Sequence, residues 1–195
     1  MWSGHFLFLA IIGSFGETSM AAHIVGIRVE AITYLPAVAW AAAAATMIGQ
    51  SLGAGDVDRA RRAGHEAVRQ CGLLGIGLTA LFFFGARLIY TLMHNSPDVV
   101  EIGAPAFRLA ALFQVPLMMG IVYVGGLRGA GDTRTPMLIT LFSTFVIRVP
   151  GAYVFGVLLG GGLYGAWIAM CIDMLTRGVL AFFRFARGRW IDIRV

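Results

Sequence analysis

The sequence predicts an all-α integral membrane protein, built as a polytopic bundle of transmembrane helices. Hydrophobic residues make up 58% of the 195 residues, charged residues only 13%, and the mean hydropathy is +0.81. Soluble domains carry roughly 45–50% apolar and about 25% charged residues, so a soluble fold of this chain would expose too much apolar surface. The second observation is that five apolar segments, each long enough to cross a bilayer, alternate with short polar turns.

The chain begins with a short apolar stretch and continues with five full spans. Residues 1–15 are predicted to form a partial helix, because their apolar run is shorter than the ~20 residues that cross a bilayer. A signal peptide is the alternative, but no Lys or Arg precedes the run. Pro36 and Pro116 lie inside spans, where a missing N–H can bend a helix. The five spans are predicted at residues 20–48, 71–93, 102–127, 137–159 and 163–183.

Two glycine-rich turns share the sequence Gly-Ala-Gly-Asp, at residues 53–56 and 129–132. Glycine can end a helix by adopting the left-handed conformation, and Asp or Thr can cap the helix that follows. We expect Asp56 to cap a short amphipathic helix within residues 51–70, and Thr135 to cap the helix after the second turn. The residues that define these turns are Gly53, Gly55 and Asp56 in the first, and Arg128, Gly129, Gly131 and Asp132 in the second.

The basic residues predict the orientation of the chain. All 15 are Arg, and ten of them lie in the two turns and the C-terminal tail, whereas the opposite loops contain none. The positive-inside rule therefore places residues 51–70, 125–136 and 184–195 in the cytoplasm of a multi-pass protein of the inner (plasma) membrane. The Arg residues punctuate apolar spans, so no nucleic-acid partner is expected despite a pI near 9.9. The two cysteines lie in separate apolar runs and indicate neither a disulfide nor a metal site.

Five ionisable side chains fall deep within predicted spans, where a charge is expensive and indicates function by default, whereas Arg87 and Arg108 lie near the outer side and could snorkel outward. A rise of ~1.5 Å per residue puts three of them near the middle of a ~30 Å apolar core. One interpretation is a neutralised ion-pair network that holds helices together, and Asp173 and Arg177 are spaced to pair along one face. The other is that Glu30 or Asp173 takes up a proton, Na⁺ or a cationic substrate. The five residues are Arg28, Glu30, Arg148, Asp173 and Arg177.

Four motifs, in their order and spacing, resemble the multidrug and toxic compound extrusion (MATE) transporters. They are residues 49–56, residues 127–136, residues 148–150 (Arg-Val-Pro) and residues 184–190. The resemblance covers nearly the whole chain and is to the C-terminal lobe of that family, from the middle of its seventh helix to the end of its twelfth. It implies that residues 1–195 form one six-helix lobe whose first helix is incomplete, in a fragment or a split gene product.

The resemblance also implies a function. The chain would be the C-terminal half of an H⁺- or Na⁺-coupled efflux antiporter for drugs and other small organic cations, working by alternating access. Its partners would be membrane lipid and an N-terminal lobe, missing or separately encoded, without which it is incomplete. Some members carry coupling carboxylates in the seventh and tenth helices and others in the first, but residues 113–119 contain no acid, so no coupling residue transfers to this chain.

Four further residues each have two possible roles. Met118, Met119 and Tyr123 are candidates for lining a cavity for flat hydrophobic cations, although such residues at helical spacing also serve packing. His23 is similar to a position common near the outer end of the family's eighth helix, and it can equally be a polar helix-end residue.

Three rival functions stay open at this point. One is a flippase for lipid-linked or polysaccharide precursors in the same superfamily. Another is a non-transporting membrane module or a truncated relic. An enzyme is not expected, because no nucleophile–base pair or metal cluster appears at loop height, and no cofactor other than a coupling ion is implied.

Overall fold

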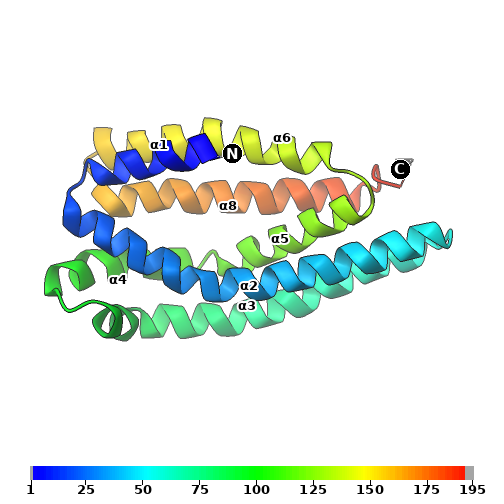
Figure 1. Cartoon of the computed structure of the whole chain (residues 1–195), viewed down its shortest axis with the longest axis horizontal. Helices are drawn as coiled ribbons and strands as arrows, with labels where there is room; N and C mark the ends of the chain where they lie inside the picture. Colours follow the sequence, from blue (N-terminus) through cyan, green and yellow to red (C-terminus); the bar gives the residue numbers. More distant parts are fainter. Residues whose placement is uncertain (1, 192–195) are drawn as a thin grey trace.

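The computed structural model describes residues 2–191, which form helices joined by short turns, without a strand (Figure 1). Four helices are long and apolar enough to cross a membrane, and a fifth span results if the bent pair α4 and α5 counts as one. The predicted all-α membrane bundle is therefore confirmed. The elements are α1 (Trp2–Gly13), α2 (Glu17–Gly53), α3 (Val57–Met93), α4 (Pro97–Ala111), α5 (Gln114–Gly129), α6 (Arg134–Phe142), η1 (Ser143–Arg148), α7 (Val149–Ala152), η2 (Tyr153–Leu158) and α8 (Gly162–Ala186).

Helices α2 and α3 are longer than the predicted spans 20–48 and 71–93. Each has 37 residues, which at ~1.5 Å per residue is about 55 Å and exceeds a ~30 Å apolar core. The amphipathic segment predicted as a short helix within residues 51–70 is the first part of α3. Nothing in this segment breaks a helix, and the Glu66–Arg69 ion pair at 2.8 Å lies on its exposed surface. The tip of the α2–α3 hairpin therefore projects past the other helices (Figure 1).

The third span is bent, but not at the expected residue. Helices α4 and α5 meet at an angle of 53° across residues 112 and 113. Pro116 lies in the first turn of α5, where the ring replaces an N–H that would have no intrahelical partner. The predicted break at Pro116 is thus corrected to a break just before it, since proline is tolerated at the start of a helix.

The fourth span runs as one 25-residue apolar helix from Arg134 to Leu158, with two wider π-helical stretches, η1 and η2. They flank the short segment α7, which contains Pro150. A proline ring displaces the carbonyl that precedes it by one turn, and the backbone adapts by shifting to i→i+5 hydrogen bonds. In η1, upstream of Pro150, the Val149 N–H accordingly donates to the Thr144 carbonyl, and in η2 the Leu159 N–H donates to the Val154 carbonyl at 2.9 Å. π-Helical turns often occur at functional sites, and η1 carries Arg148.

The core consists of two apolar clusters separated by buried polar side chains. One cluster gathers around Tyr90, Phe107 and Trp167, and the other around Leu127 and Phe185. Helix α5 lies at the centre and packs against α2, α3 and α8 (Figure 1). Small residues allow these close approaches, since there is no hydrophobic force between helices in lipid and dispersion contacts must replace it. The buried polar residues include Thr33, Gln114, Ser143 and Asp173.

Candidate functional site

The two Gly-Ala-Gly-Asp turns have the same backbone structure. In the first, Ala54, Gly55 and Asp56 donate to the carbonyls of Gln50, Leu52 and Ser51, and residues 130–132 repeat this pattern 76 positions later. The second glycine of each motif is left-handed, with φ of 75° at Gly55 and 85° at Gly131. Gly53 and Gly129 instead end α2 and α5 as their last helical residues, so the expected left-handed conformation falls on one glycine per turn.

The two aspartates of these turns have different partners. Asp56 caps α3 by accepting from the Arg59 N–H at 2.8 Å, as predicted. Asp132, only 3% exposed, accepts from the Thr135 N–H at 3.1 Å and from Arg184 Nε at 2.7 Å. The predicted cap by Thr135 is corrected, because α6 begins one residue earlier, at Arg134. Asp132 thereby ties the second turn to the end of α8.

The Asp132–Arg184 pair makes stability depend on pH. Burial alone would raise the pKa of Asp132, but the hydrogen bonds from Arg184 and Thr135 outweigh it and hold the pKa below the ordinary 3.8. A lowered folded-state pKa contributes stability that is complete above the unfolded-state pKa and is lost as the pH falls through the folded-state pKa. We expect Asp132→Asn to destabilise the protein at pH 7 by about 1.5–3 kcal/mol, the range for hydrogen bonds to charged groups.

The measurement is the melting temperature of wild type and variant between pH 7 and pH 3. The difference between them should shrink as the pH falls below about 3.8, because the unfolded wild-type chain then takes up a proton at this carboxyl before the folded protein does. Asp98→Asn, on an exposed side chain, is the matched control and should show no such convergence. A difference that stays constant down to pH 3 would contradict the assignment.

A cavity of about 630 Å³ opens among α1, α2, α5, α6, η1 and α8. Its wall is mostly apolar, and Gly120 and Gly178 let α5 and α8 approach closely there, since a Cβ at Gly120 would lie 2.9 Å from Gly178 Cα. Ligand sites of this size with a few convergent polar groups are typical for small molecules. The charged and titratable residues of the wall are His5, His23, Glu30, Arg128, Arg148 and Arg177.

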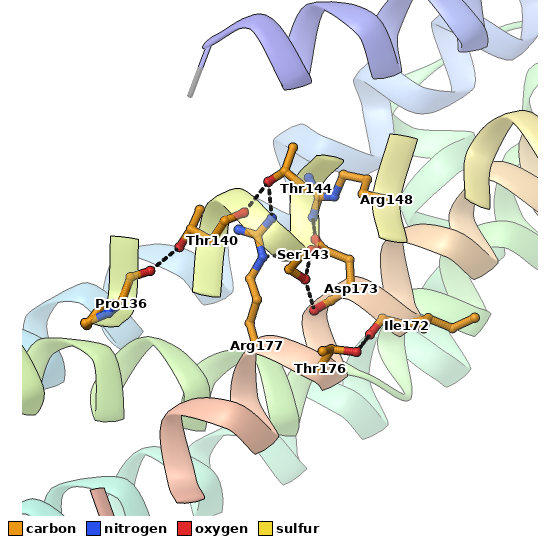
Figure 2. A network of polar contacts seen from close by, with 9 residues as sticks. All are labelled: Pro136, Thr140, Ser143, Thr144, Arg148, Ile172, Asp173, Thr176 and Arg177. Atoms are coloured by element: carbon orange, nitrogen blue, oxygen red, sulfur yellow. Dashed lines mark hydrogen bonds and ion pairs between the residues drawn. The ribbon is translucent and has the colours of Figure 1, made fainter. Parts of the chain in front are cut away.

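Asp173 is the centre of a polar network beside this cavity (Figure 2). It is fully buried, with Arg148 Nη2 2.7 Å from Oδ2 and Arg177 Nε 2.8 Å from Oδ1. The Ser143 hydroxyl also donates to Oδ1. Arg177 continues the network to Thr144 Oγ1 at 2.7 Å. Both carboxylate oxygens of Asp173 are thus engaged, and the structure pairs Arg148 with Asp173 in preference to Glu30.

Glu30 faces the cavity without a comparable partner. Its Oε1 is buried and accepts no hydrogen bond from any residue that the structure describes. Arg28, which the sequence placed among the same intramembrane charges, lies on an exposed face of α2. Arg28 therefore does not join Glu30 at the cavity, because residues two positions apart point to nearly opposite sides of a helix, and its place within the membrane stays a prediction. Arg128, predicted as a loop residue, lies in the last turn of α5 and lines the cavity.

The structure places Met118, Met119 and Tyr123 on another face of α5 than the cavity. Met118 and Tyr123 are buried in the apolar cluster around Phe185, and Met119 packs against it. The Tyr123 hydroxyl lies 3.2 Å from His65 Nδ1. The face of α5 that lines the cavity presents instead Leu117, Gly120, Ile121, Val124, Gly125 and Arg128.

Two polar contacts beside the cavity were not foreseen from the sequence. The Trp167 indole N–H donates to His23 Nδ1 at 3.2 Å, and Thr33 Oγ1 lies 2.9 Å from Gln114 Oε1. The spacing offered one signal: His23 and Glu30 are seven residues apart and so share a face of α2. Gln114 offered another, as a lone polar side chain in an apolar stretch. The identity of their partners required the tertiary packing.

Comparison of the sequence with known proteins finds relatives that carry similar names. The sequence pattern of the family described as MatE matches residues 1–154. The "Probable multidrug resistance protein NorM" of Thermotoga maritima is 29% identical over 188 residues, which is 96% of this chain and 40% of that protein. The protein of the same name from Brucella suis is 31% identical over 92% of this chain and 39% of its own length. This chain therefore spans about 40% of the length of the curated relatives that it matches.

Solved structures show the same fold. The "Crystal structure of MATE in the straight conformation" superposes with a TM-score of 0.89 at 21% identity, over 96% of this chain and 42% of that one. The helical bundle thus recurs in a known architecture. Because the family pattern covers well over half of its residues, the chain belongs to the MatE family.

Proposed function

We propose that this chain is the C-terminal lobe of a cation-coupled efflux transporter for drugs and other organic cations. The names of its relatives support export of such compounds, and its length relative to theirs supports one lobe of a larger whole. Alternating access would rock this lobe, which contains the cavity described above, against an N-terminal one. The observation that carries the proposal is the 630 Å³ cavity with a buried, unpaired carboxylate oxygen of Glu30 in its wall.

Glu30, and not Asp173, is the carboxylate suited to coupling. Asp173 is held by two guanidinium groups, so both of its carboxylate oxygens are already engaged and neither is free for H⁺, Na⁺ or a cationic substrate. Glu30 ionised would balance the remaining positive charge of the Arg148–Asp173–Arg177 group and attract an organic cation. Glu30 protonated, or neutralised by Na⁺, would leave that group with one excess positive charge and expel the cation. Exchange of the substrate for H⁺ or Na⁺ at one carboxylate is the simplest form of antiport.

The orientation proposed from the Arg distribution fits this arrangement. The two Gly-Ala-Gly-Asp turns and the C-terminal segment would face the cytoplasm of a cell whose inner (plasma) membrane holds the protein. The projecting tip of the α2–α3 hairpin would then stand in the cytoplasm, and the exposed apolar side chains of the bundle would contact lipid.

Binding of a cationic dye to the purified chain tests the role of Glu30. Tetramethylrosamine should bind saturably to the chain in lipid nanodiscs, measured by fluorescence anisotropy, and Glu30→Gln should weaken binding at least tenfold, the loss of about 1.4 kcal/mol of charge attraction. Lowering the pH from 8 to 5 should weaken binding to wild type but not to the variant if H⁺ couples. Added Na⁺ should do so at constant pH if Na⁺ couples.

The matched control is Glu101→Gln, which removes an exposed carboxylate of α4 outside the cavity and should leave the affinity unchanged. Equal affinity of wild type and Glu30→Gln for the dye would refute the proposed role of Glu30. Absence of saturable binding to wild type would refute the proposed cavity function itself.

One observation favours a second candidate, a flippase for lipid-linked or polysaccharide precursors. Three Arg side chains, at positions 128, 148 and 177, line the cavity beside the single Glu30. Guanidinium groups are well suited to phosphate. Competition decides between the two: displacement of tetramethylrosamine by undecaprenyl phosphate at concentrations where a neutral lipid has no effect would favour the flippase.

A further inference from the structure

The ring of His23 is fixed in one tautomer by its neighbour. His23 is fully buried, and its Nδ1 lies 3.2 Å from Trp167 Nε1. An indole N–H only donates, so Nδ1 must be the unprotonated acceptor and the neutral imidazole carries its hydrogen on Nε2. Phe8 and Trp167 pack edge-on against the imidazole, with ring centroids 5.7 and 5.9 Å away. Trp167 therefore acts as a positioning residue, and His23 presents Nε2–H as a donor.

That donor has no partner within the protein as described, although it is buried in the cavity wall. His23 Nε2 and Arg148 Nε are both buried without a hydrogen-bond partner among residues 2–191, and both residues line the cavity. They flank the same aromatic ring, since the Arg148 guanidinium carbon lies 5.6 Å from the Phe8 centroid. Buried polar groups are almost always hydrogen-bonded, so two donors without partners next to the same ring indicate a place for an acceptor.

The acceptor site and the carboxylate lie at different depths of the cavity. Glu30 follows His23 by seven residues on the same face of α2, which is two turns or about 10.5 Å along the axis. The Nη2 atom of Arg148 is occupied by Asp173, so its Nε offers a charge-assisted bond from a guanidinium that stays in place. His23 and Glu30 thus place a hydrogen-bond donor and a carboxylate two turns apart along the cavity wall, and Arg148 lies beside the same Phe8 ring as His23.

We propose that His23 and Arg148 form an acceptor subsite, so that the cavity prefers organic cations that also carry a carboxylate or carbonyl oxygen. This inference rests on the proposed function, because it specifies the substrate class of the same cavity. The charged groups of the wall fit it: Glu30 receives the cationic part, and the acceptor oxygen binds to the donors of His23 and Arg148. His23 acts through its neutral Nε2–H, and Trp167 acts by fixing that tautomer.

Two dyes that differ in one group test the subsite. Tetramethylrhodamine and tetramethylrosamine share the same cationic ring system, and only the first carries a carboxylate. The full chain in nanodiscs should bind tetramethylrhodamine about tenfold more tightly, since a hydrogen bond to a charged group is worth about 1.5 kcal/mol or more. His23→Phe should abolish this preference while leaving the affinity for tetramethylrosamine within about twofold. His23→Gln should retain most of it, because its amide N–H reaches the position of Nε2.

Two further measurements separate a donor from a packing role. ¹⁵N NMR of histidine-labelled protein should show His23 as the Nε2–H tautomer, and Trp167→Phe should give a mixture of tautomers with a reduced preference for tetramethylrhodamine. His94→Phe, which changes a histidine outside the cavity, is the control and should leave the affinity for both dyes unchanged.

The outcomes distinguish the subsite from the function on which it rests. If tetramethylrosamine binds and depends on Glu30 but the two dyes bind equally, or if His23 carries its hydrogen on Nδ1, the subsite is refuted and the transport proposal stands. If neither dye binds, or if Glu30→Gln has no effect on tetramethylrosamine, the proposed function fails and the subsite falls with it.

Discussion

Replacing Asp173 with Asn is expected to lower the melting temperature of the protein in detergent more than any other single change to its charged side chains. Asp173 is fully buried and holds Arg148 and Arg177 on its two oxygens. The substitution leaves two like charges close together inside the bundle without a counter-ion. Breaking one buried ion pair destabilises a protein by about 3–5 kcal/mol, and this change breaks two.

The comparison with Arg148→Ala shows whether the pairing is as described. Arg148→Ala leaves Asp173 still paired with Arg177, so its effect should be clearly smaller than that of Asp173→Asn. Arg87→Ala, on an exposed side chain of α3, is the control and should change the melting temperature little.

The double variant Arg148→Ala/Asp173→Asn should be more stable than the sum of the single losses predicts, by about 0.5–3 kcal/mol, because partners in one network couple. Fluorescence-detected size exclusion after heating measures all four proteins. Equal losses for Asp173→Asn and Arg87→Ala, or strict additivity in the double variant, would show that these charges do not pair in solution.

The sequence alone located these charges in depth but not their partners. Counting residues from the polar turns put Glu30, Arg148 and Asp173 near the middle of the bilayer, because helical rise is constant. Both acids were then predicted at a depth similar to that of Arg148. The choice between them depends on which faces of η1, α2 and α8 meet, and no local pattern encodes that rotation. The structure brings Asp173 to Arg148 and leaves Glu30 at the cavity.

The same limit explains the cavity lining. Neighbouring residues on a helix differ by 100° in direction, so Leu117 and Met118 face different sides of α5. The choice of Met118, Met119 and Tyr123 rested on residue type, and type does not distinguish a cavity wall from a packed core in a membrane protein. The helices and turns, by contrast, were predictable, because hydropathy, Gly-Asp turns and Arg placement are local signals. The joining of the amphipathic segment to α3 was missed because a change of polarity was read as a change of element.

Adding one methyl group where α2 and α5 cross should separate two helices of the bundle. A Cβ at Gly125 would lie 2.6 Å from the Ala41 Cβ and 2.7 Å from the Ala41 carbonyl oxygen, neither of which can rotate away. A Cβ at Gly129 would meet the backbone of Ala45 one turn further along. Overpacking of a well-packed core destabilises by about 1–3 kcal/mol, and contact with backbone places these sites at the upper end.

Gly125→Ala and Gly129→Ala are therefore each expected to lower the melting temperature by several degrees. Gly77→Ala is the matched control: Gly77 is an exposed helical glycine of α3 with no atom near its would-be Cβ, and alanine there should be neutral or stabilise by up to ~1 kcal/mol. A lower melting temperature for Gly125→Ala and Gly129→Ala, together with an unchanged or higher one for Gly77→Ala, would exclude a general effect of replacing glycine. Adding Ala41→Gly to Gly125→Ala removes one of the two clashing groups and should recover part of the loss. If Gly125→Ala and Gly77→Ala melt alike, α2 and α5 do not approach as closely as described, and the cavity wall that they share would have to be redrawn.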